Sequence, residues 1–408
     1  MSQSTTEPAS EGIFAIAKPT GISSAQVIRE VQRSFNPSAL FKPGLDREFE
    51  RRSREPGFEK RKRSAAKRAM NVKIGHGGTL DPLATGVLIL GIGSGTKKLG
   101  PFMTECNKQY EAVLLFGAAT DTYDTEGKVL SHKPYEHVTR EAVEIALQKF
   151  KGQIMQKPPI YSALRVQGKR MYEYAREGKE LPIEIKERPV SVLDIEVIEW
   201  MEGGTHPWHW PEQEAELEDK LVARKALHIE GDVSASEEAS SISAKRKRED
   251  TAPGPDDASP ELLDKRVKTE EQTPSGQPSR STDDLPTSNA EVQTANKENP
   301  ASAIDVPGGD STAPETATRP PCPAPACRIR MDVTSGFYVR SLCHDLGAEV
   351  GSLGIMASLV RTRQGQFKLG TNVLPFEDVS KGEEIWGPKV ESLLKQWQEN
   401  ESKGRSRE

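Results

Sequence analysis

The chain has 408 residues, of which 35% are hydrophobic and 29% are charged, and it contains 29 prolines. Its length allows two or three domains, but this composition indicates that a sizeable part is not packed core. No apolar run approaches the roughly 20 residues that span a membrane. The four cysteines are scattered without metal-ligand spacing, which favours reduced thiols over a disulfide framework or a zinc site.

The formal net charge of −5 is unevenly distributed along the sequence. Residues 211–326 contain 24 acidic and 13 basic residues, so the rest of the chain carries a net charge of +6. The part that is expected to fold is therefore basic, as a surface that binds nucleic-acid phosphates requires.

The N-terminal residues 1–11 contain no arginine and no apolar segment. They match neither a secretory signal nor a transit peptide, and we expect them to be disordered. An apolar strand is predicted at residues 13–17, followed by a turn that contains Lys18. A serine pair can then cap a helix at residues 25–34, whose apolar side chains share one face. Lys18 is a candidate phosphate contact, and a solvated turn lysine is the alternative.

Residues 36–73 are predicted to be a basic insertion that is partly helical. Within them, residues 41–73 contain 12 basic and 5 acidic side chains. This charge favours contacts with an RNA backbone or a nuclear-import signal, and the alternative is a disordered, solvated loop.

The densest motif is I-G-H-G-G-T-L-D-P-L-A-T-G-V-L-I-L at residues 74–90. Its glycines permit positive φ and close approach to a ligand, and its proline argues against a regular element through Asp81. Asp81, the only carboxylate, is therefore placed on a tight loop before a buried strand at 87–92, which is typical of a catalytic loop. The alternative is that Asp81 caps a short helical turn at 82–85.

Alternating hydrophobicity predicts strands at residues 108–116 and 188–200, and helical spacing predicts a helix at 139–150. The glycines at 91–95 fit neither a P-loop nor a dinucleotide-binding motif. Residues 156–178 are basic with interleaved tyrosines, a pattern that suits base stacking and phosphate contact.

No Phe, Tyr or Trp occurs from residue 211 to residue 336, although aromatic residues average 6% of the chain. We interpret residues 211–326 as a disordered insertion rich in Ser, Pro and acidic residues. It separates a predicted strand at 328–333 from its expected partner at 188–200. Closing so long a loop costs only about 3 kcal/mol more than a short connection. Two basic tetrads within the insertion are typical of nuclear localisation signals.

A turn, T-S-G-F-Y-V-R, leads into a helix that is predicted at residues 338–350. His344 and Asp345 are adjacent on this helix and point in different directions, so we expect both to be structural. Residues 381–408 are predicted to contain one short helix, at 389–397, and a charged tail.

The motif at 74–90, the K-P-x-G-x-S-S turn, the stretch at 156–178 and the segment around 338–350 closely resemble the TruB family, the tRNA pseudouridine-55 synthases. The resemblance implies an α+β pseudouridine synthase fold, in which helices flank a central mixed, mainly antiparallel sheet. It assigns the catalytic domain to residues 12–210 and 327–380, and leaves no length for the PUA-type RNA-binding domain of many relatives. It implies isomerisation of the T-loop uridine of tRNA, with no metal or cofactor. Whether uridines in mRNA are also substrates stays open.

By this resemblance, Asp81 is the catalytic residue, acting as a nucleophile or as a base on the ribose. Arg340 is its ion-pair partner, and Tyr110 lies against the target base. His76 is expected to hold the RNA loop open, and Leu359 to supply an apolar wall. Further RNA contacts are expected from Lys18, Gly78, Tyr161, Arg165, Lys169 and Tyr338.

Three alternatives remain open. They are an RNA-guided, dyskerin-type synthase for rRNA, a non-catalytic RNA-binding or RNA-folding protein on the same scaffold, and an interaction protein organised around residues 211–326. The dyskerin type usually has K-V after D-P, where Leu83 and Ala84 stand here. The intact set of Asp81, Tyr110 and Arg340 argues against loss of catalysis. We expect a monomer that binds the T arm of tRNA and nuclear import factors, does not bind membranes, and resides in the nucleus with cytoplasmic and mitochondrial pools.

Overall fold

The chain divides into two units, and the computed structural model describes residues of one of them, formed by 1–231 and 319–408. The described residues are 10–54, 71–177, 182–216, 220 and 321–405. Residues 232–318, which form the other unit, lie outside this set.

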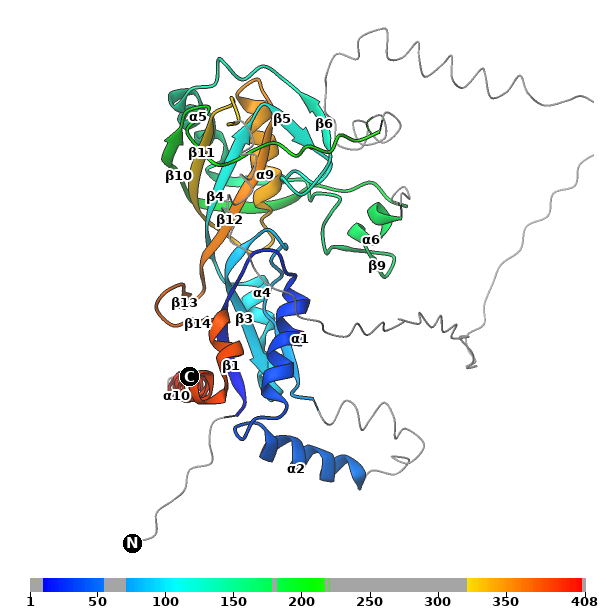
Figure 1. The fold of residues 1–408 in the computed structure, drawn as a ribbon, viewed down its shortest axis with the longest axis vertical. Coiled ribbons are helices and arrows are strands. Elements are labelled where there is room, and N and C mark those ends of the chain that lie inside the picture. The colour runs from blue at the N-terminus through cyan, green and yellow to red at the C-terminus, as the bar shows by residue number, and fades with distance from the viewer. Residues whose placement is uncertain (1–9, 55–70, 178–181, 217–219, 221–320, 406–408) are drawn as a thin grey trace, which may run out of the picture. The chain divides into compact units, whose positions relative to one another are not determined.

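A mixed sheet of ten strands forms the centre of the described unit (Figure 1). Its six long strands are β1 (Gly12–Lys18), β3 (Thr85–Ile92), β4 (Lys108–Phe116), β10 (Arg188–Met201), β11 (Ala326–Val333) and β12 (Gly354–Gln364). Its short strands are β2 (Ile74–His76), β7 (Gly152–Gln156), β13 (Phe367–Lys368) and β14 (Leu374–Pro375). Eight of them follow the order β14-β1-β3-β12-β4-β11-β10-β7, while β2 pairs with β3 and β13 with β12. Only the pairs β1–β14 and β3–β12 are parallel among these strands, so the predicted mainly antiparallel α+β fold is confirmed.

Two hairpin-like pairs lie outside the main sheet. They are β5 (Ala118–Thr120) with β6 (Val129–His132), and β8 (Arg165–Val166) with β9 (Lys169–Arg170). The helices are α1 (Ser24–Phe35), α2 (Lys42–Ser53), α4 (Gly100–Thr104), α5 (Arg140–Leu147), α6 (Met171–Arg176), α9 (Val339–Glu349) and α10 (Glu383–Arg405), with 3-10 turns η2 (Gly93–Lys98), η3 (Gln148–Phe150) and η4 (Phe376–Lys381). None of the helices in the described ranges is long and apolar enough to cross a membrane.

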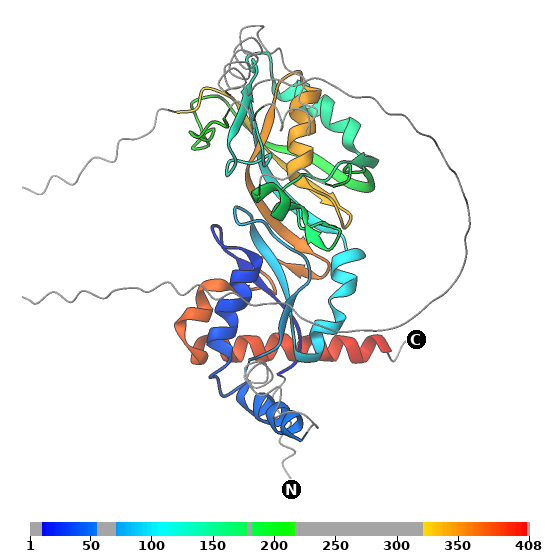
Figure 2. The same cartoon turned by 90° about the vertical axis from the view of Figure 1, so that its right-hand side faces the viewer.

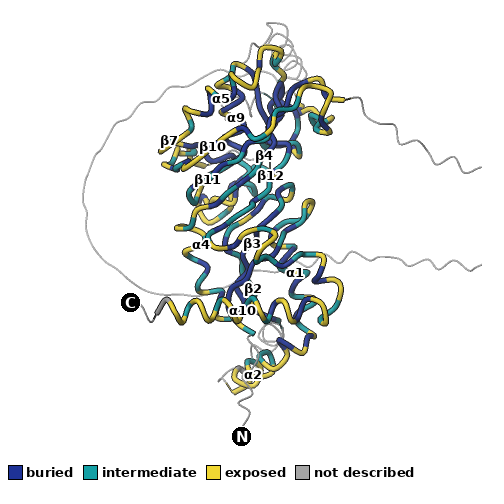
Figure 3. Tube along the Cα trace, turned by 90° about the vertical axis from the view of Figure 1, so that its left-hand side faces the viewer, coloured by how far each residue is buried: buried dark blue, intermediate teal, exposed yellow. Residues whose placement is uncertain are grey.

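The two faces of the sheet are covered by different sets of apolar side chains, because successive residues of a strand point to opposite faces. In β1, Phe14 and Ile16 join the large core under α1, α5 and α9. Ile13 and Ala15 face the other way and pack in a smaller cluster with Phe367. Figure 3 shows the buried strand residues inside the unit and exposed residues along α2 and the C-terminal part of α10.

The predicted strand pairing across the long insertion is confirmed. β10 and β11 are antiparallel, with Val197 opposite Ile329 and Trp200 opposite Cys327. A connection of more than a hundred residues between them does not prevent pairing, because the cost of loop closure grows only slowly with length.

The predicted limits of the insertion, residues 211–326, are wrong at both ends. Ala215 is buried and its N–H donates to the carbonyl of Val129 at 3.0 Å. Cys322 and Ala324 are also buried, against the side of the sheet opposite the large core. The disordered segment was predicted too long because it was inferred from a lack of aromatic residues. Small residues at its ends are nevertheless buried, since they pack against larger neighbours such as Trp210. The rest of the insertion and its basic tetrads lie outside the described residues.

The C-terminal helix is longer than predicted. The expected helix at 389–397 is instead α10, which has 23 residues and packs beside β1 (Figure 2). Proline disfavours a helix interior, yet Pro388 lies inside α10, where Trp386, which is 1% exposed, anchors the preceding turn by stacking on Phe35 at 4.4 Å. Tertiary packing therefore overrides the local proline signal.

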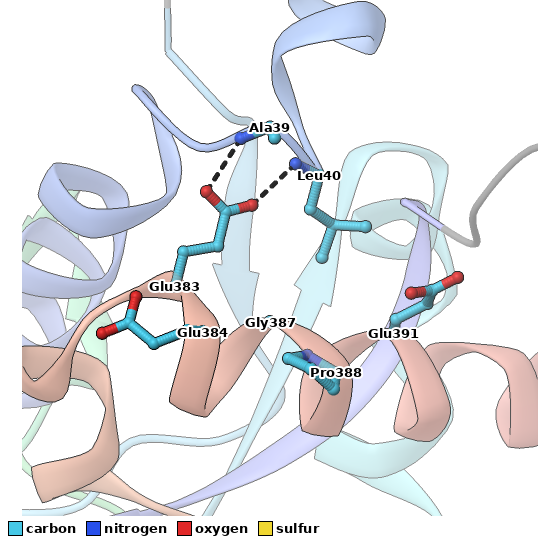
Figure 4. A pocket seen from close by; sticks show the side chains of 7 residues that line it. All are labelled: Ala39, Leu40, Glu383, Glu384, Gly387, Pro388 and Glu391. Carbon is cyan, nitrogen blue, oxygen red and sulfur yellow. Dashed lines mark hydrogen bonds between the residues drawn. The ribbon is translucent and has the colours of Figure 1, made fainter.

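The basic insertion and α10 meet at the first residue of this helix. The Glu383 carboxylate accepts hydrogen bonds from the N–H groups of Ala39 and Leu40 at 2.9 and 2.8 Å (Figure 4). Helix α2 follows this contact, within the stretch that was predicted to be partly helical. The most basic residues of the insertion, from 55 to 70, lie outside the described part of the chain.

Candidate active site

The loop that carries Asp81 connects β2 to β3 and contains no helical turn. The N–H of Ala84 donates to the carbonyl of Asp81 at 3.1 Å, which closes a tight turn. Ser24 at the start of α1 both donates to the carbonyl of Leu80 and accepts from its N–H, at 3.0 and 2.9 Å. The K-P-x-G-x-S-S segment therefore fixes the loop from one side.

Lys18 belongs to the same support, and its predicted role as a phosphate contact is wrong. The residue is 1% exposed, and its Nζ donates to the carbonyls of Pro19, Pro82 and Ala84 at 2.7, 3.1 and 2.6 Å. Burial lowers the pKa of the Lys18 ammonium to about 8, although the charge of Asp81 opposes this shift. Lys18 thus ties the loop to β1 and has no surface to offer to RNA.

Gly86 ends the loop where β3 runs beside β12. Its φ is +98°, and a Cβ built on it would lie 2.2 Å from the carbonyl oxygen of Arg361. No other residue fits this position, because both the conformation and the close approach of the two backbones require glycine. The parallel pairing of Gly86 with Arg361 then joins the Asp81 loop to β12.

The predicted partner of Asp81 is in place. The Nε of Arg340, at the start of α9, donates to Oδ2 of Asp81 at 2.9 Å. Its Nη1 and Nη2 donate to the carbonyls of Thr122 and Tyr161, both at 2.8 Å. The Arg340 side chain is 6% exposed and that of Asp81 is 35% exposed. A buried, planar guanidinium with several fixed acceptors thus orients one oxygen of an accessible carboxylate.

Asp124, which the sequence analysis did not single out, is a second carboxylate at this guanidinium. Its Oδ2 lies 3.7 Å from Nε of Arg340, and its side chain is 7% exposed. Oδ1 accepts from Thr122 Oγ1 at 2.5 Å and from the N–H of Glu126 at 3.1 Å. Burial raises the pKa of the Asp124 carboxyl to about 6, although Arg340 opposes this rise. The available signal was the run D-T-Y-D-T-E-G, in which only the fold distinguishes a surface acid from a buried one.

Tyr110 is held in the sheet by a second buried arginine. Its ring is 6% exposed, and its hydroxyl accepts from Nε of Arg361 at 3.1 Å. Arg361 is 2% exposed and also donates to the carbonyl of Thr79 at 2.8 Å and to Gln364 at 2.9 Å. Leu359, two residues before Arg361 on β12, is 6% exposed and belongs to the same core as Tyr110. The two predicted base-contacting residues therefore line one face of the sheet, and their contacts with a base stay predictions.

His76 and Gly78 flank the turn before Asp81. Burial lowers the pKa of His76, and its Nδ1 has no hydrogen-bond partner within the described part of the chain. Gly78 has a φ of +132° and lies against Gln364, whose Nε2 donates to the carbonyl of Gly77 at 2.6 Å. His76 ends β2 and Gly78 lies on the loop that carries Asp81, and their RNA contacts stay predictions.

Tyr338 directly precedes α9 and is held by an amide on β7. Its N–H donates to Oε1 of Gln156 at 2.8 Å, and its carbonyl accepts from Nε2 of the same side chain at 2.9 Å. The guanidinium of Arg188 lies 4.6 Å from the centre of its ring. Gln156 is 2% exposed. Its two hydrogen bonds to the backbone of Tyr338 fix the position of the start of α9, which carries Arg340.

The basic and aromatic segment at 156–178 divides between two places. Tyr161 enters the candidate site through its carbonyl, which accepts from Arg340. Arg165 and Lys169 lie on the β8–β9 pair, with Lys169 4.8 Å from the centre of the Tyr174 ring. Arg176 lies near another tyrosine ring of α6. This small subdomain presents cations beside aromatic rings and makes no contact with Asp81 that the structure records.

A metal ion has no evident place at this site. Within the described ranges, no group of three or more His, Cys, Asp or Glu side chains could hold one. The ionisable groups that the structure brings together there are the Asp81 carboxylate, the Arg340 guanidinium and the Asp124 carboxyl, whose pKa burial raises to about 6.

Comparisons with known proteins agree on one family. The family description "TruB family pseudouridylate synthase (N terminal domain)" matches residues 62–208. The chain is 36% identical over 374 residues to "tRNA pseudouridine synthase 4" of Schizosaccharomyces pombe, covering 90% of this chain and 82% of that protein. It is 32% identical over 390 residues to "tRNA pseudouridine synthase 4" of Saccharomyces cerevisiae, covering 94% and 84%.

Among solved structures, "Crystal Structure of a Cbf5-Nop10-Gar1 Complex" matches with a TM-score of 0.42 and 16% sequence identity, over 95% of this chain and 61% of that chain. A superposition at this level is too loose to equate individual residues. The sequence relatives carry the assignment, because they are similar over most of their own length as well as over most of this chain. The chain belongs to the TruB family of pseudouridylate synthases.

Proposed function

We propose that the chain is a tRNA pseudouridine synthase that converts the T-loop uridine at position 55 into pseudouridine. The observation that carries the proposal is the contact of 2.9 Å between Arg340 and Asp81. This contact joins two sequence motifs of a chain that is 36% identical to a protein named tRNA pseudouridine synthase 4.

The reaction rearranges the uridine without adding or removing atoms overall. The bond between N1 and the sugar C1′ breaks, the base turns, and a bond forms between C5 and C1′. C5 then loses its proton, and N1 ends with one. Asp81 acts on the sugar in the first step, as a nucleophile at C1′ or as a base on the ribose. Arg340 fixes the direction of the carboxylate and balances its charge.

The surrounding residues prepare the base for this step. A uridine must leave its stack to reach Asp81, which costs a few kcal/mol, and the pre-folded T loop lowers this cost. Tyr110 stacks on the extruded base, Leu359 supplies an apolar wall, and His76 keeps the RNA loop open. Cations of the β8–β9 pair, among them Arg165 and Lys169, contact the RNA backbone.

The test is pseudouridine formation on a T-arm minihelix, with RNA binding measured in parallel. Asp81→Ala is expected to abolish the isomerisation and to leave the affinity for the minihelix within a few fold. Asp46→Ala, which removes an exposed acid of α2 paired with Lys42, is the control and keeps both properties. Turnover by purified Asp81→Ala would refute the assignment, and site mapping in tRNA would show whether position 55 is the target.

We further propose that the protein acts as a monomer in the nucleus, with pools in the cytoplasm and mitochondrion, and that some mRNA uridines are also substrates. The nuclear location is supported by the basic tetrads at 245–248 and 265–268, a pattern typical of nuclear localisation signals. The test is the location of a fluorescent-protein fusion of the chain in cells. Loss of its nuclear signal when both tetrads are replaced with alanine would support the import signal. Unchanged localisation of that variant would contradict it.

A further inference from the structure

The loop between β5 and β6 contains a residue with an uncommon backbone conformation. Within the described ranges, Tyr123 and Gln167 are the non-glycine residues with positive φ, and Tyr123 has a φ of +63°. A bulky residue adopts this left-handed region only when its surroundings hold it there, because the conformation is strained. Tyr123 lies between Thr122 and Asp124, which both contact Arg340.

The backbone on both sides of Tyr123 is fastened to β12. The N–H of Met356 donates to the carbonyl of Tyr123 at 3.0 Å, and the carbonyl of Met356 accepts from Thr125 at 3.1 Å. The N–H of Tyr123 itself donates to Thr120 at 3.3 Å. These bonds fix where the loop runs, but they leave the orientation of the tyrosine ring to another contact.

That contact is a stack on α9. The rings of Tyr123 and His344 lie 4.1 Å apart between centres, with an angle of 17° between their planes. Tyr123 is 7% exposed. Burial lowers the pKa of His344 to about 4, so its ring is uncharged near neutral pH. The pair is therefore a contact between two neutral, stacked rings, which stabilises their relative orientation.

His344 follows Arg340 by four residues on α9, and residues at this spacing lie on the same face of a helix. Arg340 holds the carbonyl of Thr122 and lies near the carboxylate of Asp124, and His344 holds the ring of Tyr123 between them. One face of α9 therefore contacts three consecutive residues of the β5–β6 loop, 122 to 124.

We propose that Tyr123 and His344 are positioning residues for the isomerisation, whose stack holds the loop so that Thr122 and Asp124 aim at Arg340. The proposal rests on the proposed function, because its effect reaches the substrate through the Arg340–Asp81 contact. Without the stack, the left-handed residue relaxes, the Thr122 carbonyl and the Asp124 carboxylate shift, and Arg340 loses the acceptors that orient it. Small displacements of this kind can reduce a rate by roughly 100-fold.

The test compares variants that keep or lose the stack without adding backbone strain. Tyr123→Asn removes the ring but tolerates positive φ, and His344→Ala removes the other ring. Both are expected to lower the single-turnover rate on the T-arm minihelix roughly 10- to 100-fold, with little change in RNA affinity. Tyr123→Phe and His344→Phe keep an aromatic ring and are expected to restore the rate to within a few fold of the unmodified chain.

A stability control separates positioning from general weakening of the fold. Tyr135→Ala removes an aromatic contact with Trp210, whose ring centre lies 5.8 Å away, outside the candidate site. It is expected to lower the melting temperature without changing the rate. Tyr123→Gly replaces Tyr123→Asn if the latter does not fold, because glycine also accepts this φ.

The outcomes distinguish the two proposals. Rates of Tyr123→Asn and His344→Ala within about twofold of the unmodified chain would refute the positioning role while leaving the proposed function intact. A rate loss that Tyr123→Phe fails to restore would also refute it, because the ring would not be the property that matters. An unmodified chain that forms no pseudouridine would refute the proposed function, and the positioning role with it.

Discussion

Arg340 and Asp81 are 259 residues apart in the sequence, and their side chains meet with a distance of 2.9 Å between Nε and Oδ2. The guanidinium is almost fully buried while the carboxylate is a third exposed. This asymmetry suits a site in which the arginine is part of the scaffold and the acid is presented to a substrate.

Arg340→Lys is expected to lower the single-turnover rate roughly 100-fold or more, although the charge is kept. An ammonium cannot reproduce the planar fork that also serves the carbonyls of Thr122 and Tyr161. Arg363→Lys is the matched control, because Arg363 is a partly exposed arginine of β12 paired with Asp332, and its rate should stay within about twofold. A lysine variant at 340 with the unmodified rate would mean that the guanidinium geometry is unimportant.

Asp124→Asn is expected to change how stability depends on pH. The folded-state pKa of Asp124, about 6, lies above its ordinary value of 3.8. The folded chain therefore holds this proton more tightly than the unfolded chain, and the group's contribution to stability is lost as pH rises from about 4 to about 6. Over that window the stability of the unmodified chain, relative to Asp124→Asn, should fall by up to about 3 kcal/mol. Urea unfolding of both proteins across the window measures this difference.

The same carboxyl should also influence the rate. Protonation below about pH 6 removes a negative charge beside Arg340, so the single-turnover rate of the unmodified chain should decline there. Asp124→Asn should be slow throughout and should not show this decline, while Asp345→Asn, which removes another carboxyl of α9 whose pKa burial also raises to about 6, should still show it. If the rate of Asp124→Asn declined below the same pH as that of the unmodified chain, the titrating group would be another one.

Gly86→Ala is expected to destabilise the fold by roughly 3 kcal/mol or more. The added Cβ would lie 2.2 Å from the carbonyl oxygen of Arg361, and the φ of +98° would be strained as well. Gly100→Ala is the matched control, because no atom lies within 4 Å of the Cβ position there. Its unfolding free energy should change by less than about 0.5 kcal/mol. Similar urea midpoints for the two variants would contradict the close approach of β3 and β12.

Deletion of residues 221–318 with a short Gly-Ser linker is expected to leave the melting temperature and the minihelix activity nearly unchanged. Deletion of 211–326, by contrast, also removes Ala215, Cys322 and Ala324, which are buried, and should lower the melting temperature clearly. Equal melting temperatures would show that these ends contribute nothing to stability. A folded but inactive 221–318 deletion would show that the insertion takes part in the reaction.

Much of the local structure could be predicted from the sequence. The period of two in β4 and β11, the capping serine of α1 and the glycines around Asp81 act over a few residues. Each therefore leaves a readable pattern, and the motif at 74–90 was enough to place Asp81 on a loop and to indicate the family. The β10–β11 pairing was predictable too, because two alternating strands in the folded part needed partners.

Other features were decided only by the tertiary structure, because burial depends on what the rest of the chain places around a residue. Lys18 and Arg165 are both cations in basic motifs, yet the first is enclosed by carbonyls and the second is exposed. Asp124 differs from its neighbours in D-T-Y-D-T-E-G only because Arg340 and the core surround it. The sequence by itself determined which side chains were available for the chemistry, and folding determined which of them share a guanidinium, since contacts between residues 259 apart have no local signal.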